Sequence, residues 1–96
     1  MTTLRIEHAI NSYDAWRAAF DRFADARARA GVTSFAIRRP VDDPLYLVLD
    51  LEFPTPAAAE GFAAFLHGQV WSSPESSPGL AGIPQTRVLD LIGVGD

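Results

Sequence analysis

The sequence predicts an α+β domain in which two helices cover one face of a four-stranded antiparallel sheet. Three segments alternate between apolar and polar residues, which indicates half-buried strands, and a fourth segment near the C-terminus is expected to be the last strand. Two further segments repeat apolar residues at spacings of three and four, which is typical of amphipathic helices. Their order along the chain is strand, helix, strand, strand, helix, strand. Right-handed crossovers then place the first and third strands in the centre of the sheet and the other two at its edges.

The first strand and the first helix have the clearest patterns. The segment 4–10 alternates strictly, and Asn11 and Ser12 after it are typical N-cap residues. A stripe of large side chains then predicts one helix that continues to about Ala30. Gly31 ends it, because glycine enters the left-handed region without a Cβ penalty. The inward face of the strand consists of Leu4, Ile6, His8 and Ile10, and the stripe of Tyr13, Trp16, Phe20, Phe23, Arg27 and Ala30.

The rest of the chain divides by the same criteria. A turn is indicated by Asp42, Asp43 and Pro44, and a helix start by Thr55 followed by Pro56. The expected elements are a strand over 33–39, a turn over 40–44, a strand over 45–53, a helix from 56 to about 68, a loop over 72–84 and a last strand over 85–92. This order is the split βαβ arrangement of the ferredoxin-like fold, in which both helices cover the same sheet face.

The sheet face without helices has a mixed composition. Its expected members include an aromatic residue, aliphatic residues and charges of both signs, namely Arg5, Glu7, Ala36, Arg38, Tyr46, Val48, Asp50 and Glu52. A solvated face would carry fewer apolar residues, and a closed core would carry fewer charges. We therefore expect a homodimer that forms through this face and encloses a partly polar space. A plain solvent-exposed sheet is the alternative.

Composition narrows the classes of function. The 96 residues fit a single domain over 1–96, and the net charge of −4 argues against a nucleic-acid partner. The chain has no cysteine, which excludes disulfides and a thiol nucleophile. It has no apolar run of membrane-spanning length and no signal-peptide pattern, so we expect a cytoplasmic protein without a membrane partner. With two histidines and no phosphate-binding or dinucleotide motif, neither a metal nor a cofactor is expected.

His8 is the candidate catalytic residue. An imidazole titrates near neutral pH and can therefore accept or donate a proton on a phenolic substrate. The alternative is a core histidine bonded to the backbone. Trp16 is a candidate substrate-binding residue, with a flat ring and an N–H donor for an aromatic ligand. Its place on the helix stripe also fits simple core packing.

A second group of candidates belongs to the helix-free face. Tyr46, Arg38 and Asp50 are candidate substrate-binding residues, together with Glu7. A guanidinium and a carboxylate there can orient an enol or carboxylate substrate. The alternative is that these side chains form salt bridges between subunits and fix the register of the dimer.

Several of these residues also carry a family resemblance. The block Tyr13–Asp21 following His8, the strand 49–53 and the segment Gly79–Pro84 resemble the dimeric α/β-barrel superfamily, in particular small antibiotic-biosynthesis-monooxygenase-like bacterial proteins. One departure is Glu7, where relatives usually carry Arg. The resemblance implies a homodimer whose two sheets form a barrel, with a pocket between sheet and helices in each subunit.

The superfamily includes cofactor-independent oxygenases of polyketide-like aromatics, polyketide cyclases, heme-degrading enzymes and proteins without known activity. The first hypothesis is therefore a cofactor-free monooxygenase-like or cyclase-like enzyme that acts on a small aromatic or polyketide-like molecule. The second is a non-catalytic homodimer that binds a small hydrophobic ligand or serves as a structural module. Heme binding through His67 is a third hypothesis with less support, because the accompanying Asn and Trp of heme-degrading relatives are missing. A surface histidine at a helix C-terminus suits His67 better.

Overall fold

The computed structural model describes residues 1–73 and 77–95, and within them the expected order of strands and helices is confirmed. The strands are β1 (Thr2–Ile10), β2 (Ser34–Arg38), β3 (Tyr46–Phe53) and β4 (Leu80–Asp90). The helices are α1 (Tyr13–Arg22), α2 (Ala24–Ala30), α3 (Pro56–Phe65) and a π-helical turn, η1 (Leu66–Val70).

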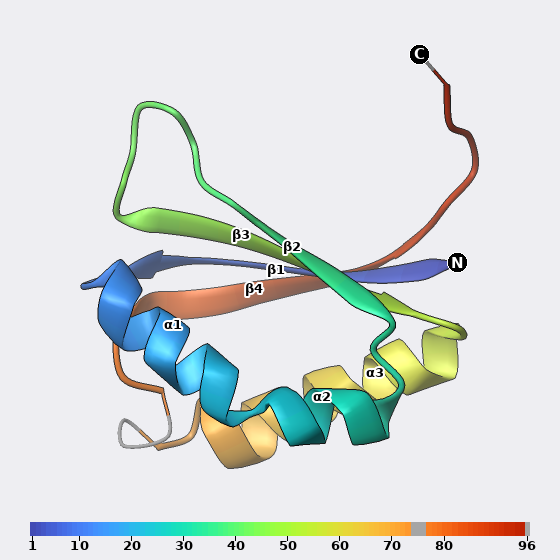
Figure 1. Ribbon diagram of the computed structural model, residues 1–96, viewed down its shortest axis with the longest axis horizontal. Coiled ribbons are helices and arrows are strands. Elements are labelled where there is room, and N and C mark those ends of the chain that lie inside the picture. Colours follow the sequence, from blue (N-terminus) through green and yellow to red (C-terminus); the bar gives the residue numbers. More distant parts are fainter. Residues whose placement is uncertain (74–76, 96) are drawn as a thin grey trace.

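The four strands form one antiparallel sheet in the order β2-β3-β1-β4, so β1 and β3 lie in the centre as the sequence predicts. All helices of the described residues lie on one face of this sheet, and none of these residues forms a helix on the other face (Figure 1). This is the expected ferredoxin-like fold. Within one chain the sheet is open rather than closed into a barrel, so a barrel would need a second copy.

The hydrophobic core fills the space between the sheet and the helices. Side chains of β1 alternate between buried and half-buried along the whole strand, which confirms the predicted inward face. The largest fully buried side chains all come from the two central strands: Phe53, Leu4, Ile6, Leu47 and Leu51. Burial of these apolar groups is the main force that holds the helices on the sheet.

The predicted single helix over 13–30 is wrong in one respect, because Phe23 divides it into α1 and α2. At Phe23 the backbone leaves helical geometry (φ −96°, ψ 15°), and its N–H bonds to the carbonyl of Phe20. The Arg27 guanidinium also donates to that Phe20 carbonyl. The apolar stripe continues through the break, and without a Gly or Pro the pattern gave no sign of it.

The predicted last strand is also corrected: β4 begins at Leu80 instead of Gln85 and ends at Asp90. The predicted loop is correspondingly shorter, and its residues 74–76 lie outside the described part. A loop was predicted here because Gly82 and Pro84 are typical loop residues. In the structure both lie in a bulge of β4, where the ladder is interrupted and these residues are tolerated.

The second predicted helix begins as expected and ends in a different geometry. The Thr55 side chain caps α3 by accepting from the N–H of Ala58, and Pro56 follows it. After α3 the helix continues as the wider π-helical turn η1, where the N–H of Trp71 bonds to the carbonyl of Leu66 at 2.8 Å. Across residues 1–73 and 77–95, no helix is long and apolar enough to cross a membrane.

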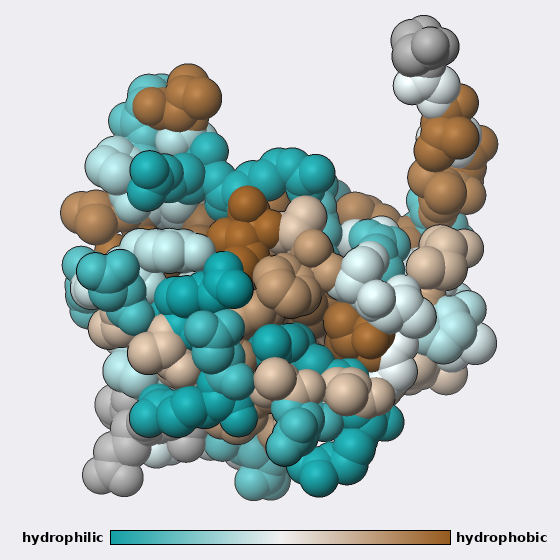
Figure 2. Space-filling view, in the orientation of Figure 1, coloured by the Kyte–Doolittle hydropathy of each residue, from teal (hydrophilic) through white to brown (hydrophobic). Residues whose placement is uncertain are grey.

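The last described residues, 91–95, extend away from the sheet beyond its helix-free side, as does the loop between β2 and β3 (Figure 1). The tail is largely hydrophobic on its surface (Figure 2). Leu91, Ile92 and Val94 are all exposed in the single chain. Several of the most exposed apolar side chains therefore belong to segments that project past the helix-free face, whereas Ile83 lies in the bulge of β4.

Candidate functional site

A cavity of about 70 Å³ lies between the sheet and the helices. Side chains of both central strands form one wall, and those of α1, α2, α3 and η1 form the other. The main lining residues are Ile6, His8, Leu49, Leu51, Trp16, Phe20, Arg27, Phe62, Leu66, Val70 and Trp71. Ser77, Pro78 and Leu80 also line it where the chain enters β4. The lining is thus apolar except for His8, Arg27 and Ser77, as is typical of small-molecule sites.

His8 is held at this cavity by its own strand. It belongs to the inward face of β1 and is only 4% exposed. Its Nδ1 lies 2.9 Å from the carbonyl oxygen of Ala9. A carbonyl only accepts hydrogen bonds, so Nδ1 carries the proton in this arrangement and Nε2 has the free lone pair. Nε2 has no hydrogen-bond partner in the described residues. His8 can therefore present a neutral acceptor nitrogen to a molecule in the cavity.

Burial lowers the pKa of His8, and the hydrogen bond to the Ala9 carbonyl opposes this with a smaller effect. The low-dielectric surroundings disfavour the imidazolium, because a charge loses its hydration there. His8 is therefore mostly unprotonated at neutral pH, which is the form that a general base needs.

The bulge in β4 lies opposite His8. On β1 the register moves from Glu7 to Ala9, while on β4 it moves from Gln85 to Ala81. Pro84 has no N–H for the ladder, and Gly82 takes a positive φ of 72°. The regular ladder is thus interrupted at His8, and bulges of this kind often re-aim a side chain beside a functional site.

Trp16 forms the neighbouring part of the cavity wall. Its ring centroid lies 6.3 Å from that of His8, and it stacks on Phe20 at 5.0 Å. The backbone next to it is tightly packed: a Cβ on Gly79 would lie 2.7 Å from the Trp16 nitrogen. The N–H of Asn11 also bonds to the Gly79 carbonyl at 2.7 Å. The start of α1 and the chain entering β4 are therefore fixed to each other at the cavity.

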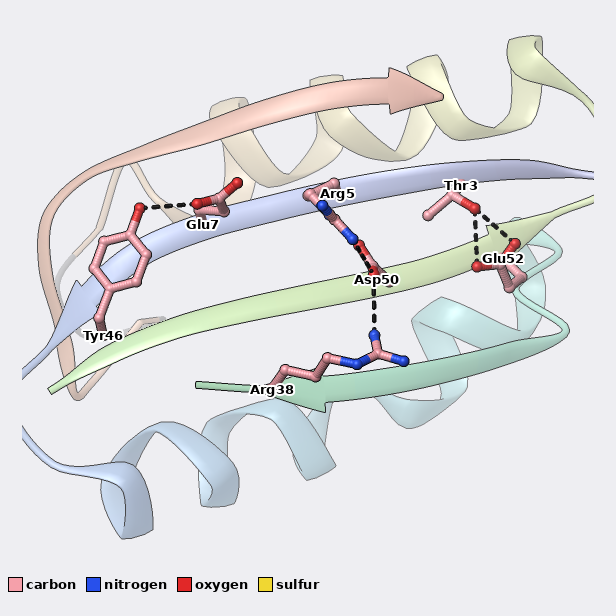
Figure 3. Close-up of polar contacts among 7 residues, drawn as sticks. All are labelled: Thr3, Arg5, Glu7, Arg38, Tyr46, Asp50 and Glu52. Carbon is pink, nitrogen blue, oxygen red and sulfur yellow. Dashed lines mark hydrogen bonds and ion pairs between the residues drawn. The ribbon is translucent and has the colours of Figure 1, made fainter. Parts of the chain in front are cut away.

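The other predicted site residues lie on the opposite, helix-free face (Figure 3). Asp50 is 7% exposed and accepts two hydrogen bonds from Arg5, at 2.8 and 2.9 Å. Arg38 donates a third at 3.2 Å. The hydrogen bond and the charge of Asp50 raise the pKa of Arg5. The carboxylate of Asp50 is thus fully engaged by two guanidinium groups.

Tyr46 belongs to the same face, where its hydroxyl donates to Glu7 at 3.1 Å. Partial desolvation raises the pKa of Tyr46, and the hydrogen bond to the Glu7 carboxylate adds a smaller increase. Beyond Asp50, Thr3 bonds Glu52 in the same way (Figure 3). With Arg38, Tyr46 also borders an open hollow of about 560 Å³ beside α1.

The structure therefore divides the predicted residues between two places. His8 and Trp16 line the cavity together, whereas Tyr46, Arg38 and Asp50 lie across the sheet from it. A single site holding His8, Trp16 and Tyr46 does not exist within one chain. The sheet itself separates them, because side chains of neighbouring strand residues point to opposite faces.

Arg27 is a cavity residue that the sequence reasoning placed only on the helix stripe. It is 8% exposed and its guanidinium carbon lies 3.6 Å from the centroid of the Phe20 ring. A charged residue on an otherwise apolar helix stripe was the signal available in the sequence. To recognise Arg27 as a cavity residue, the position of the cavity must be known, and no sequence pattern reveals it.

His67 takes no part in this cavity. It is exposed and packs edge-on against Trp71, with ring centroids 4.8 Å apart. Residues 1–73 and 77–95 contain no group of three or more His, Cys, Asp or Glu side chains arranged to hold a metal ion.

The strand order and the one-sided placement of the helices define the chain as a ferredoxin-like α+β domain. No family model matches the sequence, and no curated protein does either. Solved structures do share the fold over nearly the whole chain. One, described as a candidate antibiotic biosynthesis monooxygenase from Nitrosomonas europaea, has a TM-score of 0.68 at 18% identity and covers 97% of this chain and 100% of its own.

A similarly described protein from Bordetella bronchiseptica has a TM-score of 0.68 at 16% identity, covering 95% of this chain and 97% of its own. A dimeric ferredoxin-like protein from an uncultured marine organism has a TM-score of 0.61 at 15% identity, covering 98% of this chain and 96% of its own. At these identities the likeness establishes the shared fold, which agrees with the resemblance noted in the sequence.

Proposed function

We propose that the protein is a homodimer that binds a small aromatic or polyketide-like molecule in the cavity beneath the sheet, where His8 removes a proton from it. Proton removal is the step that a cofactor-free monooxygenase-like enzyme and a cyclase-like enzyme would share. The observation that carries the proposal is the geometry of His8. Its Nδ1 is bonded to the Ala9 carbonyl, and its ring borders an apolar cavity.

The chemistry follows from this arrangement. A neutral Nε2 can accept a proton from a phenol or from a carbon next to a carbonyl group, and His8 becomes an imidazolium while the ligand becomes a phenolate or enolate. The hydrogen bond from Nδ1 to Ala9 would strengthen as charge develops on the ring. The ring of Trp16 next to His8 offers a flat surface for an aromatic ligand.

The size of the cavity sets a condition on binding. A volume of about 70 Å³ holds water-sized groups, whereas an apolar cavity of about 150 Å³ accommodates one benzene ring. The cavity must therefore widen to admit an aromatic ring. Trp71 and the segment 77–80 are walls that can move, because they are only partly buried, unlike the strand side chains that face them.

The homodimer is supported by the exposed surface of the single chain. Its accessible surface is 5973 Å², whereas a compact monomer of this mass exposes about 5,400 Å². The excess agrees with the projecting β2–β3 loop and the apolar tail (Figure 2). A second copy packed on the helix-free face would cover both. A solved neighbour of the same fold is described as dimeric, which is consistent with this proposal.

In such a dimer, Tyr46, Arg38 and Asp50 would lie between the subunits. Their side chains are already paired with Glu7 and Arg5 within the chain. We therefore assign them to the interface first, where the preformed network would fix the register of the two sheets. They would contact a ligand only in a space enclosed by both subunits.

The second candidate is a non-catalytic homodimer that binds a small hydrophobic ligand or acts as a structural module. The small cavity volume and the backbone hydrogen bond of His8 favour it, because both are also found at a simple core histidine. A single experiment separates the two candidates.

The experiment uses 2-tetralone, an aromatic ketone whose carbon-bound protons next to the carbonyl exchange with solvent through the enolate. Proton NMR in D2O would follow the exchange rate with wild-type protein, with His8→Gln and with His67→Gln as the matched histidine control. We expect the wild type and His67→Gln to accelerate exchange and His8→Gln not to. Binding of the ketone without acceleration would establish the non-catalytic candidate as a ligand-binding protein. The absence of binding would contradict the enzyme and leave the structural module.

A further inference from the structure

Arg27 is a buried cation at the cavity that the proposed proton transfer does not use. It lies on α2 and packs its guanidinium on the face of Phe20, with Phe35 at 5.6 Å. One N–H of the group donates to the Phe20 carbonyl in the last turn of α1. This contact favours a cation, because a helix C-terminus carries partial negative charge. It engages one of the five N–H donors of the group.

The charge of Arg27 has no carboxylate partner in the described residues. The ion pairs found there are Arg5–Asp50, Arg17–Asp21 and Arg38–Asp50. Burial lowers the pKa of Arg27, and the charge of Asp21 opposes this more weakly. A guanidinium nevertheless stays protonated at neutral pH. Burying a charge without a paired anion costs free energy. An anion that binds to such a site removes part of this cost, so it binds more favourably than at an exposed arginine.

The remaining donors of Arg27 are not sealed in the core. No buried side-chain nitrogen or oxygen in the described residues lacks both a hydrogen-bond partner and accessible surface. The Arg27 nitrogens that make no hydrogen bond therefore retain some accessible surface, and the residue borders the same cavity as His8. The planar fork of a guanidinium matches the two oxygens of a carboxylate.

From these contacts we propose that the cavity selects ligands that carry a carboxylate, which Arg27 binds while the aromatic part lies against Trp16 and Phe20. The proposal rests on the proposed function, because it names the ligand class of the same cavity. It adds that a small aromatic carboxylate binds more tightly than its uncharged analogue. His8 then stands at the same ligand with a neutral nitrogen, which does not repel the guanidinium.

The test compares benzoate with benzamide, which has nearly the same shape and no charge. Proton–nitrogen NMR would follow the indole N–H signals of Trp16 and Trp71, which both line the cavity. For the wild type we expect benzoate to bind at least tenfold more tightly than benzamide. Arg27→Met should remove this preference by weakening benzoate alone.

Arg17→Met is the matched control, because Arg17 also lies near Phe20 and Phe35, at 5.7 and 5.8 Å, but is paired with Asp21 and borders a different hollow. It should keep the preference for benzoate. Should Arg27→Met fail to fold, Arg27→Lys keeps the charge without the fork and should lower the preference without abolishing it. The comparison of the two probes on wild-type protein needs no variant.

Equal affinity of the wild type for the two probes, or an unchanged preference in Arg27→Met, would overturn the assignment of Arg27 and leave the ligand-binding proposal standing. Failure of both probes to shift either indole signal would instead refute ligand binding in the cavity, and the role of Arg27 with it.

Discussion

His8 donates its Nδ1 proton to the carbonyl oxygen of Ala9, the next residue on β1, across 2.9 Å. This bond selects one tautomer of a buried imidazole and leaves Nε2 as the acceptor nitrogen at the cavity. The same burial that suits a base also makes the protonated form of His8 unfavourable in the folded protein.

Stability should therefore fall as the pH is lowered through the range just below 6.5. Burial lowers the pKa of His8 in the folded state relative to its unfolded value of 6.5. Between the folded and unfolded pKa values the unfolded chain binds more protons, so the free energy of unfolding decreases as pH falls. Urea unfolding between pH 5 and 8 measures this slope. His8→Gln should flatten it, whereas His67→Gln, which keeps His8, should retain it. An unchanged slope in His8→Gln would show that His8 is not the titrating group.

Gly79 should tolerate no side chain. With φ at 84°, an added Cβ would lie 2.7 Å from the Trp16 nitrogen and 2.9 Å from the Ser12 carbonyl oxygen. Gly79→Ala should lower the free energy of unfolding by about 3–4 kcal/mol, because neither backbone atom can move aside without disturbing α1. Gly82 is the control: its φ of 72° is also positive, but nothing lies within 4 Å of an added Cβ. Gly82→Ala should cost about 1–2 kcal/mol. Equal losses in thermal or urea unfolding would refute the close contact.

Asp50→Asn should weaken the network on the helix-free face. Asp50 is buried and accepts from both Arg5 and Arg38, so the amide would leave part of this hydrogen bonding unmatched. Both arginines reach solvent, with side chains 42% and 65% exposed, and water can replace some of what is lost. We expect a loss of about 1–2 kcal/mol in urea unfolding. Asp90→Asn, at the exposed end of β4, should have no measurable effect. An unchanged free energy of unfolding in Asp50→Asn would mean that the network does not contribute to stability.

Val48→Glu should separate the proposed dimer. Val48 lies on the helix-free face, between Tyr46 and Asp50 on β3. A carboxylate there would lie opposite Glu7 on β1, while Arg38 opposite it on β2 is already paired with Asp50, so the added charge would oppose association. Light scattering should give about twice the chain mass of 10.4 kDa for the wild type and a monomer for the variant. Ala64→Glu, on the exposed side of α3, should stay dimeric. A wild-type monomer at micromolar concentration would contradict the assigned interface.

The sequence predicted most of the fold because its strands and helices follow two simple periodicities. The alternation in 4–10 and in 45–53 identified both central strands and the residues on each face. What it missed depends on geometry without a residue signature. The break at Phe23 lies within an unbroken apolar stripe, and the early start of β4 was masked by Gly82 and Pro84 in a bulge.

The candidate site could also be predicted only in part from the sequence. Alternation on β1 placed His8 toward the helices, and Trp16 followed from the helix stripe, so these two could be predicted to lie on one side of the sheet. Arg27 could not be recognised as a cavity residue, since its role depends on how α2 turns after Phe23. The hydrogen bond that sets the tautomer of His8 likewise depends on backbone geometry that no pattern encodes.

The central claim is that His8 and Trp16 together bind an aromatic ligand under the sheet. Its most direct test is an NMR measurement of nuclear Overhauser effects between bound 2-tetralone and the protein side chains. We expect contacts from the aromatic protons of the ketone to the indole of Trp16, and from the protons next to its carbonyl to the imidazole of His8. Contacts confined to Tyr46 and Val48 on the helix-free face would contradict the account.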